Sequence, residues 1–228
     1  MPSQFGQDLF ALEALGGKRG GFFLDSGAAD GVSASNTQLL EASFGWNGIC
    51  VEPNATFFAE LIKNRRAFCV NCCLYDREDE VEFVEGANVL GGILAEYDPS
   101  LLRHAKATFR LPEDAGGRPP TVRKTARTIR SVLQEFGAPQ VIDYWSLDTE
   151  GSELTILKSF PFDEYAFRVL TVEHNRFPIR ESIREFLEPR GYRRIRAIEI
   201  DDGYVREDLL GHPSWRSGAW RRRGGSRT

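Results

Sequence analysis

The sequence predicts an α/β fold in which helices cover both faces of a mostly parallel sheet. Short, almost wholly apolar segments alternate with segments that repeat apolar residues at helical spacing, a pattern typical of strand–helix–strand units. Several of the apolar segments end in an acidic residue that is followed by small residues. In sheets of this kind, ligands bind beyond the carboxyl ends of the strands, so these endings are the first place to look for a site.

The first half of the chain supplies the amino-terminal helices and three of the expected strands. Residues 9–15 carry apolar side chains at helical spacing until Gly16 and Gly17 end the pattern, so a short helix precedes the sheet. The next elements follow as alternating strands and helices. Strands are expected at 21–25, 48–52 and 67–73, and helices at 36–44 and 56–64.

The second half continues the alternation. Ser152 followed by Glu153 is a typical helix start, where the acid complements the helix dipole. Strands are expected at 141–147, 168–173 and 192–200, and helices at 152–160 and 179–189.

Two segments depart from this pattern. Residues 80–85 alternate acidic and hydrophobic side chains, which predicts a half-exposed strand or an edge hairpin outside the central sheet. Residues 86–125 have no clear period and are rich in Gly, Pro and Arg, with room for short helix at 94–97 and 101–104. We expect this insertion to be a lid, an acceptor-binding segment or a disordered loop.

Composition limits the classes of function. With 228 residues, 41% of them hydrophobic, one domain over 1–210 is expected, followed by a basic, disordered tail over 211–228. A formal net charge of −4 argues against a general polyanion binder, so no nucleic acid partner is expected. The chain has no apolar run of transmembrane length and no signal-peptide pattern, which predicts a cytoplasmic protein. The tail's positive charge comes from Arg216, Arg221, Arg222, Arg223 and Arg227.

The cysteines are expected to be reduced core residues. Cys69 and Cys72 have the spacing of a metal or redox pair, but strand alternation would place them on opposite faces. A structural zinc site needs four ligands, and the sequence offers no second pair at suitable spacing. Cys50 and Cys73 likewise fall within or beside apolar segments.

The first candidate site is the turn after the strand at 21–25. Asp25 ends that strand, and Gly27 and Gly31 would let the backbone approach a ligand that a Cβ atom would exclude. Glu52 ends the next strand, where an acid accepts hydrogen bonds from a ribose diol. Together these residues predict a nucleotide site. An ordinary turn and a solvated strand-end acid are the alternative for each residue alone.

The ligand of this site is expected to be S-adenosylmethionine. A dinucleotide fingerprint requires three glycines, and Ala29 occupies the position between the two that are present. S-adenosylmethionine has no phosphate and needs a carboxylate near its amino group and an acid for its ribose. Asp25 and Glu52 supply these groups. A nucleotide-sugar or NAD enzyme is the less favoured alternative.

A second group of polar residues follows the strands at 141–147 and 168–173. Asp148 and Glu150 come after one strand, and Glu173, His174 and Asn175 end the other. Two explanations compete. In one, the acids hold the donor and His174 or Asp148 is the base; in the other, Asp148, Glu173 and Asn175 bind Mg²⁺ or Mn²⁺ through oxygen.

At these residues the chain resembles the FkbM family of S-adenosylmethionine-dependent methyltransferases. The similarity spans roughly residues 3–208. It rests on SQFGQD at 3–8, FLDSGAADG at 23–31, SNT at 35–37, GWNG at 45–48, VEP at 51–53, DTEG at 148–151 and VE at 172–173. The resemblance implies the Rossmann-like class I methyltransferase fold, an αβα sandwich around a seven-stranded sheet that ends in an antiparallel hairpin, here 195–200 with 204–206.

The resemblance also implies roles for individual residues and an acceptor. It assigns donor binding to Asp25, Gly27 and Glu52, places Asn36 and Thr37 along the turn and Cys73 near the adenine, and directs Asp148 and Glu150 at the methyl group. The family mostly methylates oxygen, so a sugar, glycan or related natural product is the expected acceptor. Another class of interpretation is a non-catalytic nucleotide-fold domain that binds a partner through the insertion and the basic tail.

Overall fold

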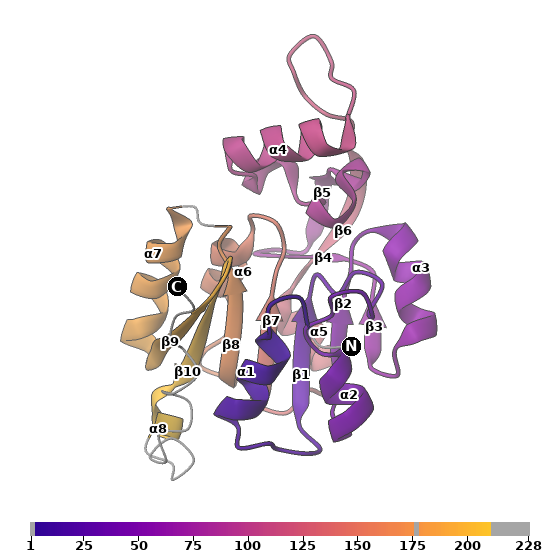
Figure 1. The fold of residues 1–228 in the computed structure, drawn as a ribbon. Coiled ribbons are helices and arrows are strands. Elements are labelled where there is room, and N and C mark those ends of the chain that lie inside the picture. The colour runs from indigo at the N-terminus through magenta and orange to yellow at the C-terminus, as the bar shows by residue number, and fades with distance from the viewer. Residues whose placement is uncertain (1–2, 176–177, 211–228) are drawn as a thin grey trace, which may run out of the picture.

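A seven-stranded sheet forms the centre of the molecule in the computed structural model, which describes residues 3–175 and 178–210 (Figure 1). The strand order is β3-β2-β1-β7-β8-β10-β9, and only β10 runs antiparallel to its neighbours. This confirms the predicted α/β fold with a mostly parallel sheet and a final antiparallel hairpin. The strands are β1 (Phe22–Ser26), β2 (Asn47–Val51), β3 (Phe68–Val70), β7 (Val141–Leu147), β8 (Ala166–Glu173), β9 (Tyr192–Ile198) and β10 (Asp201–Arg206).

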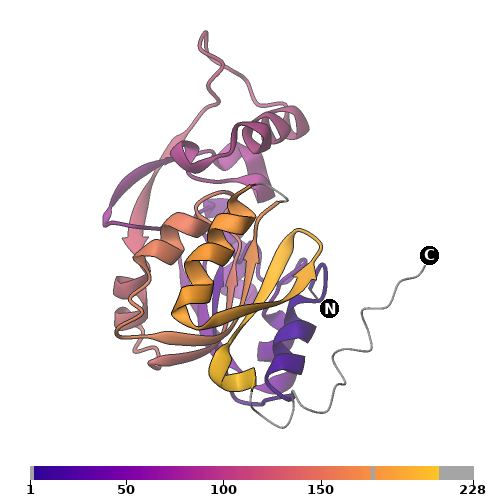
Figure 2. The same cartoon turned by 90° about the vertical axis from the view of Figure 1, so that its left-hand side faces the viewer.

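Helices cover the sheet on both faces because successive strand residues are apolar on both sides. Phe23 and Tyr144 pack under α1 (Gln7–Ala14), α2 (Gln38–Phe44) and α3 (Ala55–Asn64). Their neighbours Leu24 and Trp145 pack on the other side, under α5 (Ile129–Glu135), α6 (Glu153–Ser159) and α7 (Ile179–Leu187). Figure 2 shows α1, in indigo, and the orange helices α6 and α7 on opposite sides of the sheet. Short elements η3 (Glu188–Arg190) and α8 (Glu207–Leu210) flank the last hairpin.

The expected single strand at 67–73 is wrong. The chain leaves the central sheet after β3 and enters a second sheet of order β4-β6-β5, made of β4 (Cys73–Tyr75), β5 (Asp79–Phe83) and β6 (Val122–Thr128). Asn71 fixes this change of direction, because its side-chain nitrogen donates to the carbonyl oxygens of Glu52 (2.7 Å) and Pro53 (3.2 Å). The placement of β5 in this sheet confirms that 80–85 lies outside the central ladder.

The insertion contains more regular structure than its sequence indicated. It holds η1 (Glu85–Leu90), η2 (Leu94–Glu96), α4 (Pro99–Phe109) and the start of β6. Asp98 caps α4 by accepting a hydrogen bond from the Ser100 N–H at 2.7 Å. Two residues of this helix, Leu101 and Ala105, are buried. We call the second sheet together with residues 85–121 the upper lobe. It lies above the carboxyl ends of the central strands (Figure 1).

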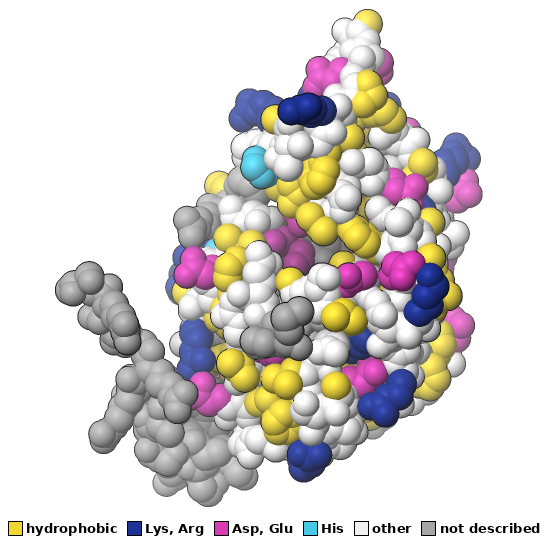
Figure 3. All heavy atoms as spheres, turned by 45° about the vertical axis from the view of Figure 1, so that its right-hand side comes forward, with side chains coloured by type: hydrophobic (Ala, Val, Ile, Leu, Met, Phe, Trp, Pro, Cys, Tyr) yellow, Lys and Arg dark blue, Asp and Glu magenta, His cyan; other side chains and the backbone are white. Residues whose placement is uncertain are grey.

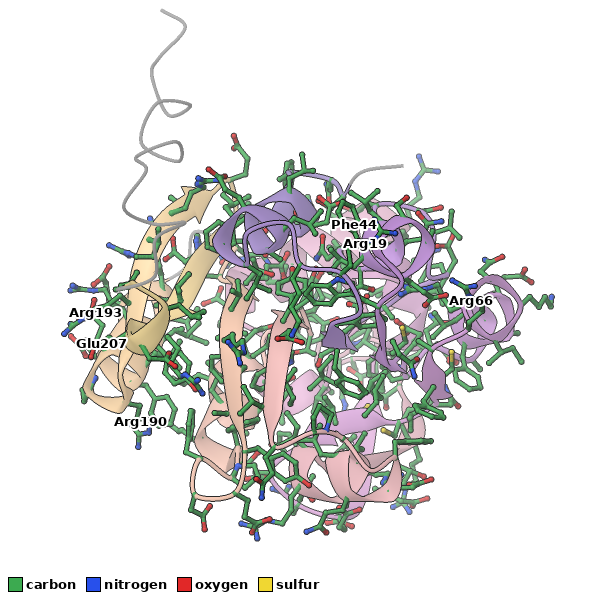
Figure 4. All side chains as sticks on the ribbon, turned by 90° about the horizontal axis from the view of Figure 1, so that it is seen from below. Arg19, Phe44, Arg66, Arg190, Arg193 and Glu207 are labelled. Atoms are coloured by element: carbon green, nitrogen blue, oxygen red, sulfur yellow. The ribbon has the colours of Figure 1, made fainter. Side chains whose placement is uncertain are left out.

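Stabilising contacts also lie at the amino ends of the central strands, on the side of the sheet away from the upper lobe (Figure 4). The Arg19 guanidinium lies 5.5 Å from the ring centroid of Phe44, and Arg193 and Glu207 form an ion pair of 2.5 Å. Among the described residues, no helix has the length and apolar character needed to cross a bilayer. The basic tail expected at 211–228 lies outside the described residues.

Candidate active site

A cavity of about 270 Å³ lies where the carboxyl ends of the central strands meet the upper lobe. Figure 3 shows a recess there, with acidic side chains inside it and hydrophobic side chains along its upper border. Its walls come from the ends of β1, β2, β7 and β8 and from residues 88–91 and Ile93 of the insertion. Of the predicted site residues, those that line the cavity are Asp25, Gly27, Asn36, Glu52, Cys73, Asp148, Glu150, Glu173 and Asn175.

Glu52 is held in place by two backbone groups. Its Oε2 accepts a hydrogen bond from the Ala29 N–H at 2.8 Å, and its Oε1 accepts one from the Asn54 N–H at 2.7 Å. The Asn54 side chain in turn caps α3 by accepting from the Thr56 N–H at 2.9 Å. Burial raises the pKa of Glu52 to about 7 despite these two hydrogen bonds. The carboxylate therefore has a fixed orientation before any ligand binds.

Asp25 is buried beside a cation that sequence reasoning missed. Its carboxylate accepts a hydrogen bond from the Thr37 hydroxyl, and the Arg65 Nη1 lies 3.9 Å away. Arg65 also pairs with Glu41 at 3.0 Å, and its guanidinium is buried in this network. Burial nevertheless raises the pKa of Asp25, because the loss of water outweighs the attraction of Arg65. No motif predicts this pair, because Asp25 lies in β1 and Arg65 directly follows α3.

The two turn glycines have a different steric role from the one expected. A Cβ atom on Gly27, whose φ is +88°, would lie 1.8 Å from the backbone oxygen of Asp148, so this glycine lets two loops of the protein meet. Gly31 does not line the cavity, and a Cβ atom there would lie 2.6 Å from side-chain atoms of Arg65 and Leu61. Thr37 lies behind the cavity wall, where it supports Asp25.

Asn36 lines the cavity and has a buried side-chain oxygen. Its side-chain nitrogen donates to the Ser146 hydroxyl at 2.9 Å, whereas its Oδ1 has no hydrogen-bond partner among the described residues. A buried acceptor without a donor is costly unless a ligand or water supplies one. This atom is therefore a candidate acceptor for a ligand or a water molecule.

The far wall of the cavity is apolar. Cys73 lies there, and burial raises the pKa of its thiol to about 12, so the thiol is uncharged. The residues that complete this wall include Phe57, Cys72, Leu74, Phe83 and Ile93. An aromatic base of a ligand would fit this side of the cavity.

Three acids form a cluster at the end of the cavity. Carboxylate oxygens of Asp148, Glu150 and Glu173 all lie within 4.8 Å of one another. The side-chain nitrogen of Asn175 donates to Glu173 at 2.8 Å and to Glu150 at 3.3 Å, so this amide bridges the two carboxylates. Burial, with the nearby charge of Asp201, raises the pKa of Asp148 to about 8. Burial and repulsion from Asp148 raise the pKa values of Glu150 and Glu173 well above their ordinary value.

The backbone around the cluster is strained. Glu150 and Asn175 have positive φ angles of 59° and 47°, in the left-handed region that residues with a Cβ atom seldom adopt. Strain of this kind persists where the surrounding structure fixes it, and it is concentrated at functional sites.

His174 does not line this cavity. It lines a second cavity of about 260 Å³ that adjoins the first and shares Glu173 and Asn175 with it. The His174 Nε2 lies 3.8 Å from the Asp202 carboxylate, and burial lowers the pKa of the imidazole. The predicted base therefore lines a different cavity from Asp25 and Glu52.

A family model and several solved structures are similar to this chain. A family model described as "Methyltransferase FkbM domain" matches residues 25–194. The chain is similar to methyltransferase FkbM from Methylobacillus flagellatus KT, with 15% identity and a TM-score of 0.47, over 82% of this chain and 43% of that one. It therefore spans less than half of the length of that structure.

Two further solved structures are similar at low identity. Precorrin-6y C5,15-methyltransferase from Geobacter metallireducens GS-15 has 10% identity and a TM-score of 0.43, over 87% of this chain and 88% of that one. The METTL16 MTase domain has 11% identity and a TM-score of 0.42, over 87% of this chain and 78% of that one. No curated protein sequence matches the chain.

Proposed function

The chain belongs to the FkbM methyltransferase family and has a class I methyltransferase fold, and from this premise we propose that it methylates a hydroxyl oxygen. S-adenosylmethionine, the methyl donor that the family implies, would occupy the cavity at the carboxyl ends of the central strands. The acceptor would be a sugar, a glycan or a related natural product.

The observation that carries this proposal is the pairing of Asn36 and Glu52 in one cavity. The unpartnered Oδ1 of Asn36 can accept a hydrogen bond from the amino group of the donor, and the buried Asp25 carboxylate lines the same cavity. Glu52, oriented by two backbone N–H groups, can accept hydrogen bonds from a ribose diol. The apolar wall at Cys73 completes the fit with space for the adenine.

Methyl transfer to oxygen needs an acceptor for the hydroxyl proton. The hydroxyl oxygen forms the new bond to the methyl carbon while the carbon–sulfur bond breaks, and the electron pair goes to sulfur. In the protein without a bound cation, the Asp148 carboxylate would take the proton, because its pKa of about 8 lies closer to that of a useful base than an ordinary carboxylate's does. His174, on the wall of the adjoining cavity, is the second candidate.

We further propose that a divalent cation, Mg²⁺ or Mn²⁺, binds Asp148, Glu150 and Glu173. Three buried carboxylates with oxygens within 4.8 Å of one another match the oxygen ligands that these ions prefer. Bound there, the ion would supply Lewis acidity that lowers the pKa of an acceptor hydroxyl. Asn175, which the sequence placed among the ligands, would hold Glu150 and Glu173 in position through its amide nitrogen.

Two measurements on the purified protein test the proposal. Calorimetry should detect binding of S-adenosylmethionine, and mass spectrometry should detect transfer of labelled methyl from it to members of a panel of glycosides and small molecules. Failure to bind the donor would favour the alternative of a non-catalytic binding domain. Binding followed by methylation of nitrogen or carbon alone would retain the donor site and overturn the assignment to oxygen.

A further inference from the structure

Residues 3–8 fold into a tight hook in front of α1, which we call the amino-terminal hook. The Ser3 hydroxyl donates a hydrogen bond to the Asp8 Oδ1 at 2.7 Å, and the Ser3 N–H donates to the Asp8 Oδ2 at 3.0 Å. The Gly6 N–H donates back to the Ser3 hydroxyl at 3.1 Å. Because the Asp8 side chain is fully buried, these hydrogen bonds fix the two ends of the hook against each other.

The hook is also joined to the central sheet. The Gln7 Nε2 donates to the Oδ2 of Asp201, the first residue of β10, at 3.0 Å. The preceding residue, Ile200, lines the cavity that we assign to the donor, the donor cavity. The Ile200 carbonyl accepts hydrogen bonds from the N–H groups of His174 (2.9 Å) and Asn175 (3.3 Å), directly after β8. The hook is therefore fixed beside the part of the donor cavity that the ends of β8 and β10 form.

Gln4 is an exposed residue of the hook, and it lines the donor cavity. Its neighbours Ser3, Gln7 and Asp8 are buried, and their side chains form the hydrogen bonds that give the hook its shape. The Gln4 side chain ends in a primary amide, which can donate and accept hydrogen bonds. The hook therefore places an uncharged amide at the wall of the donor cavity. These residues precede the span 25–194 that the family model matches.

The strand order indicates which part of the donor lies near Gln4. The adenine is proposed to lie at Cys73, which follows β3, and the ribose at Glu52, which follows β2. The hook is joined to β10, and β2, β1, β7 and β8 lie between β3 and β10 in the sheet. Gln4 therefore lies towards the end of the cavity away from the adenine. The amino-acid part of the donor would occupy that end.

The carboxylate of that amino-acid part needs N–H groups when it leaves water. The turn after β1 uses some of its own N–H groups internally, since those of Gly27 and Ala28 both donate to the Val51 carbonyl, at 2.9 and 3.1 Å. A carboxylate bound beside this turn therefore gains from an N–H group that another segment supplies. The amide of Gln4 supplies one from the hook.

We propose that Gln4 is a donor-binding residue whose side-chain nitrogen donates a hydrogen bond to the carboxylate of S-adenosylmethionine. Ser3 and Gln7 are positioning residues, because they hold the hook that carries Gln4. The inference rests on the proposed function, since the donor is the one assigned there.

The first test compares S-adenosylmethionine with methylthioadenosine, which keeps the adenine, ribose and sulfur but lacks the amino-acid part. Gln4→Ala should weaken binding of S-adenosylmethionine about tenfold or more and leave the affinity for methylthioadenosine unchanged. The matched control is Phe5→Ala, in an exposed hook residue outside the cavity lining, which should bind both ligands like the wild type. Calorimetry measures S-adenosylmethionine directly and methylthioadenosine by competition.

Two results of this comparison would contradict the inference. Equal dissociation constants for S-adenosylmethionine in Gln4→Ala and Phe5→Ala would remove Gln4 from the donor site. Equal losses for the two ligands in Gln4→Ala would show that Gln4 does not act on the amino-acid part of the donor.

The second test reverses the sign of the interaction. Gln4→Glu places a carboxylate where the amide lies, so it should bind S-adenosylmethionine about threefold or more weakly than Gln4→Ala does, because like charges repel. Binding as tight as in Gln4→Ala, or tighter, would overturn the assignment of the donor's carboxylate as the partner of Gln4.

The third test examines the role of the hook. Ser3→Ala removes the hydroxyl that joins the two ends of the hook, so it should weaken binding of S-adenosylmethionine but not of methylthioadenosine. If Ser3 acts through Gln4, the double variant Ser3→Ala/Gln4→Ala should bind no more weakly than Gln4→Ala alone. Losses that multiply in the double variant would overturn the positioning role of Ser3.

The wild-type protein separates this inference from the function on which it rests. Wild-type protein that binds no S-adenosylmethionine would refute the proposed function itself. Wild-type protein that binds it no more tightly than Gln4→Ala does would refute only the role of Gln4. Wild-type affinity of the variants for methylthioadenosine verifies that they fold.

Discussion

The backbone N–H of Ala29 donates a hydrogen bond to the Glu52 carboxylate at 2.8 Å, which joins the turn after β1 to the end of β2. The side chain of Ala29 has no part in this contact. Ala29 has a φ of 47°, so the turn is held in a strained conformation with its N–H directed at the carboxylate. Glu52 therefore connects the turn after β1 to the end of β2, and it is also the proposed hydrogen-bond acceptor for the ribose.

Glu52→Ala should weaken donor binding strongly. Removing the acceptor of a charge-assisted hydrogen bond to the ribose should cost about 1.5–3 kcal/mol of binding free energy. The turn at Ala29 also loses its hydrogen bond to the carboxylate. Glu52→Gln keeps an acceptor oxygen and should lose less. Calorimetry gives the dissociation constants, with Glu60→Gln, an exposed change on α3, as the control. An unchanged constant in folded Glu52→Ala would remove Glu52 from the site.

Donor affinity should rise with pH because of Glu52. Its pKa of about 7 means that the carboxylate is mostly protonated at pH 6 and mostly ionised at pH 8. If the donor binds the ionised form, the dissociation constant falls by roughly one order of magnitude over this range. Calorimetry across the range should show that slope in wild-type protein and a flatter one in Glu52→Gln. A slope that survives in Glu52→Gln would assign the titration to another group.

Asn36→Leu should weaken donor binding without a large loss of stability. The substitution removes the unpartnered Oδ1 that we assign to the donor's amino group, at a cost of about 1–3 kcal/mol in binding. Ser146→Ala is the matched control, because it removes the same internal hydrogen bond to Asn36 but keeps Oδ1. Similar dissociation constants for the two variants would show that Oδ1 does not contact the donor.

Gly27→Ala should destabilise the fold itself. Its Cβ atom would lie 1.8 Å from the Asp148 carbonyl oxygen, so the expected loss is about 3 kcal/mol or more. Gly45→Ala is the control, since Gly45 also has a positive φ but no atom within 4 Å of the added carbon, and about 1 kcal/mol is expected there. Denaturant unfolding measures both. Equal losses would mean that the two loops can separate freely.

Chelation tests the proposed cation. Removing divalent ions should stop turnover, Mg²⁺ or Mn²⁺ should restore it, and Asp148→Asn should remain inactive in excess metal. Asp30→Asn, in a carboxylate outside the cluster, should respond to metal like the wild type. Full activity in protein shown by elemental analysis to be metal-free would refute the cation. Loss of turnover in His174→Ala, with donor binding intact, would then favour the imidazole as base.

The positions of the strand-end acids could be predicted because they depend on local patterns. The apolar segments predicted the bounds of β1, β2 and β7 to within one residue. In a parallel sheet, the residues that follow such strands must meet at one edge. That rule brought Asp25, Glu52 and Asp148 to one cavity. The helix α5 was missed although its signal was present, with a Thr128 cap and apolar residues at Ile129, Val132 and Leu133.

The sequence by itself determined most strands of the central sheet, the family, and which acids line the carboxyl edge of the sheet. Only the tertiary structure decided how those groups are used. The burial of Arg65 beside Asp25, the contact of Gly27 with Asp148 and the separation of His174 from the donor cavity all join residues far apart in the chain. Such contacts depend on how loops and helices pack around a shared core, and the periodicity of a sequence records only which face of one element is buried.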